Sequence, residues 1–356
     1  MPSKRGNFRL GVRLKAILSY DIKMSAYTLL EQNALNFQLK PVSLREFLFL
    51  NETPCSLYAL ENGLYKILLK KRSFINSMIL KDLINKGHAQ VYIPHEDRVD
   101  LAIQQQEELR KLTRSLSIGN LLDNGKKQLN LLTSHMSFLY ENPTNDQALS
   151  LQYQSARNLC HFLYQHPEIH EPLYREFLKQ KHHYIFAQPL LASLFLVGIL
   201  KMARLFSDKE VESLFITSYF KDIGMSAIPT VKYDQEELST EDKQLLARHS
   251  KYSVQILTGR LPLSPQYLKI IENHHSFSLL TRELGLDSST DKTLVKGFET
   301  MIISTTDIIS AMIAERPYRP STPVFEALEL VKVLISDQFP HEFKLVVSYF
   351  RNFFRR

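Results

Sequence analysis

The chain has 356 residues, of which 44% are hydrophobic and 23% charged, a balance that excludes a fully disordered protein and leaves room for two domains. The net charge of +7 is compatible with an anionic ligand but does not by itself indicate DNA binding. Two cysteines cannot form a disulfide framework, and only 11 glycines argue against a glycine-rich nucleotide-binding loop.

The N-terminal region is basic from Met1 to Lys15, but no apolar stretch of signal-peptide type follows it. Together with the low cysteine count, this predicts a reducing, cytoplasmic location. Residues 1–40 lack a regular pattern apart from a short apolar-periodic run from Ala26 to Leu35. We therefore expect the folded core to begin near residue 41.

Residues 41–95 have the pattern of a small α/β module, the core of a first domain over residues 1–100. Asn62-Gly63 separates two apolar runs and predicts a β-hairpin over residues 56–69. Residues 74–86 have helical spacing and stop at Gly87, and residues 91–94 read as a strand that ends at Pro94. No catalytic motif lies in this module.

Residues 101–145 read as a helical connector, and Asn124-Gly125 is expected to interrupt it. From residue 146 to residue 356 the pattern is helical, which predicts an all-α domain and an α+β fold overall. One apolar run, Tyr184 to Leu200, reaches the lower length limit of a membrane span. Because it contains Gln188 and Pro189, we favour a buried core helix, with a membrane anchor as the alternative.

Four places in the helical domain combine histidine and aspartate residues. The first is Lys221-Asp222-Ile223-Gly224, followed by Ile228-Pro229, and the second is His249, in a helix that starts with capping-box-like spacing at Ser239. The third is His274-His275, whose side chains on a helix would point about 100° apart. The fourth is Asp307, with Arg316-Pro317-Tyr318-Arg319 shortly after it. Taken singly, each is more often structural than functional.

In this order, the four motifs resemble the HD-GYP family, the helical phosphohydrolases that open cyclic di-GMP. The resemblance runs from about residue 184 to residue 339, and its spacing agrees except for a slightly long stretch between His275 and Asp307. It implies an all-α HD-type domain and a metal site. By this resemblance Asp222 is the catalytic carboxylate and a metal ligand, and the further metal ligands are His249, His274, His275 and Asp307.

The same resemblance exposes several departures from the family pattern. The first metal-binding histidine of the family aligns near Pro189, and the histidine of its His-Asp pair is Lys221. The glutamate after His-His is Ser276, and a further aspartate is Ser310. Residues 276–299 contain no Gly-Tyr-Pro loop. His182 and His183 could replace the first histidine only if the helix were shifted by two turns.

The family reaction uses two metal ions that activate water and hold the phosphate. Here the ammonium of Lys221 could neutralise Asp222 in place of one ion, although a solvent-facing Lys221 at a helix end is the alternative. We therefore expect no bound cofactor or, if a site persists, one divalent Fe, Mn or Zn ion. Arg316 and Arg319, with Lys221, are the candidate anion-binding residues, since guanidinium suits phosphate. Both arginines could equally cap a helix.

The departures favour a degenerate, non-catalytic HD-GYP-like module in bacterial signal transduction that still senses cyclic di-GMP. The alternative is a cyclic di-GMP phosphodiesterase with a mononuclear metal site. The expected partners are cyclic di-GMP, a signalling protein and a second copy of the chain in a homodimer, without nucleic acid or a membrane. Turnover of cyclic di-GMP would separate the two hypotheses.

Overall fold

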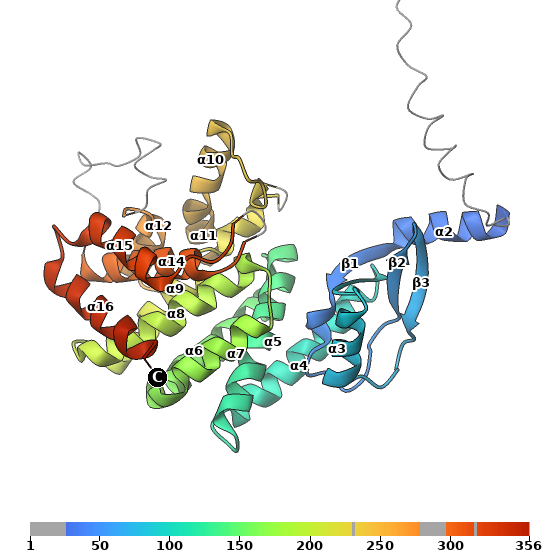
Figure 1. Ribbon diagram of the computed structural model, residues 1–356, viewed down its shortest axis with the longest axis horizontal. Coiled ribbons are helices and arrows are strands. Elements are labelled where there is room, and N and C mark those ends of the chain that lie inside the picture. The colour runs from blue at the N-terminus through green and yellow to red at the C-terminus, as the bar shows by residue number, and fades with distance from the viewer. Residues whose placement is uncertain (1–25, 230–231, 278–296, 317–318, 356) are drawn as a thin grey trace, which may run out of the picture.

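The computed structural model describes residues 26–229, 232–277, 297–316 and 319–355, which form a small sheet module beside a larger helical domain (Figure 1). Helices α4 and α5 lie between the two parts (Figure 1). The basic segment from Met1 to Lys15 lies outside the described residues. The architecture is α+β, as the sequence predicts.

The sheet module contains four antiparallel strands in the order β1-β4-β2-β3. The predicted hairpin is present and pairs Glu61 with Leu64 across Asn62-Gly63, both of which have positive φ. Helix α3 covers one face of the sheet, where a separate hydrophobic core includes Val42, Leu57 and Val91. The elements of the module are α2 (Ala26–Gln38), β1 (Leu39–Ser43), η1 (Leu44–Phe47), β2 (Leu57–Glu61), β3 (Leu64–Leu69), α3 (Ser77–Asn85) and β4 (Gln90–Pro94).

The helical domain is built around one large hydrophobic core, to which most of its helices contribute. Helix α8 runs through its centre and packs against α9 and α14. The helices are α4 (Arg98–Ser115), α5 (Leu121–Glu141), α6 (Asp146–Gln165), η2 (Pro167–Ile169), α7 (His170–Lys179), α8 (Tyr184–Ala203), α9 (Asp208–Phe220), η3 (Ile223–Ala227), α10 (Thr240–Ala247), α11 (His249–Leu257), α12 (Pro265–Asn273), α14 (Phe298–Ile313), α15 (Val324–Ile335) and α16 (Pro340–Phe353).

Helix α5 runs through Asn124-Gly125, so the predicted interruption at this dipeptide is wrong. The chain breaks earlier, and Asn120 caps the N-terminus of α5 by accepting a hydrogen bond from the backbone N–H of Asp123. Asn124 instead donates to the carbonyls of Leu116 and Ile118, which ties α5 to the end of α4. A Cβ at Gly125 would lie 3.1 Å from the Leu173 side chain, so glycine here allows close helix packing rather than a turn.

Helix α8 has the length and hydropathy of a membrane span, but 78% of its apolar window is buried inside the protein. It packs against α5, α6, α9, α14 and α16, so its apolar residues face other helices. Gly198 permits one of these contacts, since a Cβ there would lie 2.5 Å from the ring of Tyr349 on α16. This placement agrees with the prediction of a core helix.

Candidate metal centre

The candidate centre lies where the segment after α9 meets α11. Gly224 is the residue that permits this contact, because a Cβ there would lie 2.1 Å from the backbone oxygen of His249 and 2.4 Å from the nitrogen of Ser253. Ser253 Oγ accepts a hydrogen bond from the Gly224 N–H at 2.8 Å and donates one to the Lys221 carbonyl at 2.6 Å. These bonds fix Asp222 beside the first residue of α11.

The side chains of His249 and His274 have defined tautomers. His249 Nδ1 lies 2.5 Å from the carbonyl oxygen of Leu246, and His274 Nδ1 lies 2.7 Å from that of Ile271. A carbonyl only accepts hydrogen bonds, so each Nδ1 carries a proton and each Nε2 of a neutral ring offers a lone pair. This second hydrogen bond is the arrangement that orients metal-binding histidines.

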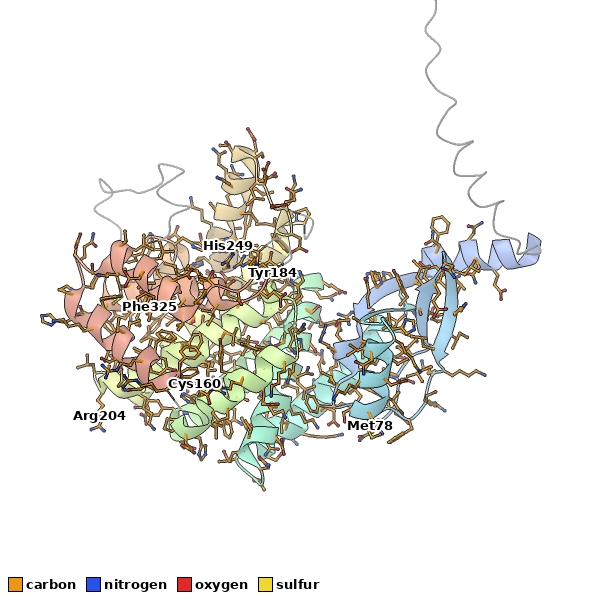
Figure 2. The ribbon with its side chains drawn as sticks, in the orientation of Figure 1. Met78, Cys160, Tyr184, Arg204, His249 and Phe325 are labelled. Atoms are coloured by element: carbon orange, nitrogen blue, oxygen red, sulfur yellow. The ribbon has the colours of Figure 1, made fainter. Side chains whose placement is uncertain are left out.

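Four ligand atoms converge at one point: Nε2 of three histidines and Oδ1 of Asp222. His249 Nε2 lies 3.3 Å from His274 Nε2 and 3.1 Å from His275 Nε2. Asp222 Oδ1 lies 3.2 Å from the Nε2 atoms of His249 and His274. All four atoms lie within 4.8 Å of one another. Figure 2 shows His249 and Tyr184 at the same end of the helical bundle.

Four of the six separations between these donor atoms fit a tetrahedral ion, and the other two are at most 4.8 Å. Zinc lies about 2.0–2.1 Å from histidine nitrogens and carboxylate oxygens, which places neighbouring ligand atoms of a tetrahedron about 3.3–3.4 Å apart. The four distances of 3.1–3.3 Å between the donor atoms lie close to that value. Neutral imidazoles that aim lone pairs at one another repel unless a cation lies between them, so the donor set fits a divalent metal ion.

Electrostatics keep two of the donors, Asp222 and His275, in the ionisation states that a metal requires. Burial alone would raise the pKa of Asp222, but the positive charge of Lys221 outweighs this effect and holds the pKa well below its usual range. Burial, with a smaller contribution from the neighbouring His274 and His249, lowers the pKa of His275 well below its usual value. The carboxylate is therefore charged and the His275 ring is neutral at pH 7.

Lys221 is fully buried and points into the centre, not to solvent. Its Nζ forms a short ion pair with Asp222 Oδ2 and lies 2.7 Å from Asp307 Oδ1. Burial favours the neutral amine, but the two carboxylates outweigh it and raise the pKa of Lys221. Asp307 thus contacts a lysine, and it does not belong to the four-residue cluster.

Gln188 extends this network and was not predicted from the sequence. Its Nε2 donates to Asp307 Oδ1 at 2.7 Å, and its Oε1 accepts a hydrogen bond from the guanidinium of Arg316 at 2.7 Å. Arg316 also stacks on the ring of Tyr184, with Cζ 4.4 Å from the ring centroid. The position of Gln188 beside Pro189, where the family resemblance places a metal ligand, was the one signal in the sequence for this contact.

The second predicted arginine is held within its own segment. Arg319 donates to the carbonyls of Ala311 and Met312 and to Thr322 Oγ1, so it caps the C-terminal end of α14. Ser276 Oγ donates to the Asn273 carbonyl and Ser310 Oγ to the Asp307 carbonyl, so both hydroxyls make local contacts. Pro317 and Tyr318, and residues 278–296 of the stretch predicted to lack a Gly-Tyr-Pro loop, lie outside the described residues.

A cavity of about 440 Å³ adjoins this network. Arg316, Tyr184 and His182 line it, together with apolar residues such as Leu191 and with the charged Lys181 and Glu315. His182 Nε2 lies 2.9 Å from Gln180 Oε1, and burial lowers its pKa to about 3, so the ring is neutral. Within this wall, the guanidinium of Arg316 is linked to Asp307 through Gln188.

Comparison with known proteins supports the fold at low sequence identity. No family description and no curated protein matches the sequence. Among solved structures, the protein is similar to “Bd1817, a HDG"Y"P protein from Bdellovibrio bacteriovorus”, with a TM-score of 0.60 and 13% identity over 88% of this chain and 99% of that one. The protein therefore has an HD-GYP-like fold, which agrees with the resemblance seen in its motifs.

Proposed function

We propose that this protein is a signalling or interaction module of HD-GYP-like fold that binds one divalent metal ion and does not hydrolyse cyclic di-GMP. The observation that carries the proposal is the buried ammonium of Lys221 between Asp222 and Asp307. It supplies a positive charge to the two carboxylates that, by the family resemblance, would hold a second metal ion.

The remaining donor set also favours binding over catalysis. Three imidazoles and one carboxylate fill the coordination of a tetrahedral ion, whereas catalytic zinc sites keep one position for water. A divalent ion bound here would supply Lewis acidity and a structural cross-link. Asp222 and His249 would then join the segment after α9 to α11, with His274 and His275 from the end of α12. Zinc is the ion that this donor set fits best among Fe, Mn and Zn.

The direct test is an assay of cyclic di-GMP hydrolysis by the full chain loaded in turn with Zn²⁺, Mn²⁺ and Fe²⁺. The proposal predicts no turnover above that of the same buffer and metal without protein. Turnover that disappears in Asp222→Asn would overturn it. The variant Ser226→Ala serves as the control, because this hydroxyl lies close by in the sequence and has no hydrogen-bond partner.

A second candidate function is cyclic di-GMP binding, with or without slow hydrolysis at a mononuclear site. The cavity lined by Arg316 and Tyr184 favours it, because a guanidinium and an aromatic ring suit a phosphate and a base. Calorimetry with cyclic di-GMP tests it on the wild type, on Arg316→Ala and on Arg351→Ala, an exposed arginine of α16. Binding that only Arg316→Ala weakens supports sensing. The absence of binding heat at millimolar cyclic di-GMP would contradict this second candidate function.

A further inference from the structure

Helix α4 belongs to both parts of the protein. Leu101, at the end of its first turn, is fully buried in the core of the sheet module. Leu109 and Leu112, two and three turns later, are buried in the core of the helical domain. A continuous helix transmits displacement along its length, so the two cores cannot move independently at α4.

At the start of α4, Arg98 joins three elements in one buried cluster. The residue is 5% exposed, and its guanidinium pairs with Glu46 on η1 of the sheet module through a short contact. The same group pairs with both carboxylate oxygens of Glu141, the last residue of α5, at 3.2 and 3.4 Å. Gln105, also on α4, donates to the Glu46 carbonyl at 2.9 Å.

The charge of Arg98 is held in place by its partners. Burial lowers the pKa of the guanidinium, but the charges of Glu46 and Glu141 outweigh this effect and raise it. Breaking a buried pair leaves an uncompensated charge and is strongly unfavourable. The Arg98 cluster therefore joins the sheet module rigidly to the C-terminal end of α5.

The residue before Glu141 reaches the candidate metal centre. Tyr140 donates its hydroxyl hydrogen to the backbone carbonyl of Asp222 at 2.8 Å. Its ring packs edge-on against Phe186 on α8, with centroids 5.0 Å apart. The last turn of α5 is thus linked to Glu46 of the sheet module through Glu141 and Arg98, and its neighbouring Tyr140 contacts the backbone of a metal-ligand residue.

We propose that the Arg98 cluster couples the sheet module to the metal centre, so that a change in the module alters metal affinity through Tyr140 and Asp222. This inference rests on the proposed metal binding. By linkage, metal binding must in turn stabilise the contact between η1, α4 and α5, because a coupling free energy acts equally in both directions. A change in the sheet module is then the signal that the protein receives, and metal affinity is the property that responds to it.

The test is a double-mutant cycle on Zn²⁺ affinity, measured by competition with a chromophoric chelator. The variants are Arg98→Gln, Tyr140→Phe and their combination, with Arg157→Gln as the control, because Arg157 forms an ion pair with Glu212 that does not involve α5. Each single change of the pathway should weaken binding at least about 5-fold, the lower range of allosteric coupling. The double variant should bind Zn²⁺ no more weakly than the single variant with the larger loss of affinity. The control should bind Zn²⁺ as the wild type does.

Additive effects, or an unchanged affinity in folded Arg98→Gln, would overturn the coupling. If Arg98→Gln does not fold, Glu141→Gln replaces it, since the Glu141 side chain is 43% exposed and its loss leaves Arg98 paired with Glu46. A second readout is hydrogen exchange of the η1 segment, which Zn²⁺ should slow in the wild type and not in Tyr140→Phe. A wild type that binds no Zn²⁺ would refute the proposed function itself, which separates the two failures.

Discussion

Replacement of Lys221 by methionine should destabilise the metal-free protein by about 3–5 kcal/mol, the usual cost of removing one partner from a buried ion pair. Methionine has a similar volume without the charge, so the change leaves Asp222 and Asp307 without their cation. The Lys221 Nζ lies 2.7 Å from Asp307 Oδ1, and the Asp307 side chain is 8% exposed. At an effective dielectric constant near 20, that pair alone attracts by about 6 kcal/mol before desolvation is subtracted.

Urea unfolding in the presence of a chelator measures this free energy of unfolding. The control is Lys71→Met, which removes two ion pairs of a side chain that is 47% exposed, and it should cost no more than about 1 kcal/mol. The double variant Lys221→Met/Asp307→Asn should recover part of the loss, because it removes one of the two uncompensated charges. A loss for Lys221→Met as small as that of the control would refute the assignment of Lys221 as an internal cation.

Two further predictions concern packing and pH. Gly224→Ala should destabilise the protein by about 1–3 kcal/mol and weaken Zn²⁺ binding, because its Cβ would lie 2.1 Å from the His249 carbonyl, and both quantities should stay unchanged in Ser226→Ala. Burial lowers the pKa of His135 to about 4, so the unfolded state binds this proton first as pH falls below 6.5, and this group alone should contribute a loss of about 3 kcal/mol between pH 7 and pH 4. His135→Gln should reduce the pH dependence of the unfolding free energy by about this amount in urea titrations, and an unchanged dependence would contradict the lowered pKa of His135.

The family resemblance grouped five residues at the centre, and the structure brings four of them together, whereas Asp307 contacts Lys221. Asp222, His249, His274 and His275 form one cluster. His274 and His275 follow the end of α12 at Asn273, and both rings contact His249, with their own centroids 4.0 Å apart. Their roles as metal ligands remain predictions.

Long-range contacts were beyond what the sequence could predict. Gln188 reaches Asp307 across 119 residues, and Tyr140 reaches Asp222 across 82. Neither belongs to a motif, and the place of Gln188 beside Pro189 was the one signal that the sequence offered for either. The sequence left two alternatives for Lys221, a solvent-facing side chain or an internal cation. Lys221 is buried because α9 packs against α14 and α12. Tertiary packing, not local propensity, sets these contacts.

The three-way junction at Arg98 illustrates the same limit. Helix propensity and the pattern of residues 101–145 indicate a helical connector between two domains. The structure shows that α4 and α5 carry buried residues of the large core and that Arg98 is buried against Glu46 and Glu141. A charged residue at a helix start usually lies in solvent, so its burial could not be read from the local pattern.

The most direct test of the account is the metal content of the full chain, purified without chelator and measured by elemental mass spectrometry. The account predicts about one equivalent of a divalent transition metal per chain, zinc foremost, and its loss in His249→Ala. Arg157→Gln should keep the wild-type content. Two equivalents per chain would contradict the role of Lys221 as the second cation, and a wild type that contains no metal and takes up none from added Zn²⁺ would contradict the metal centre itself.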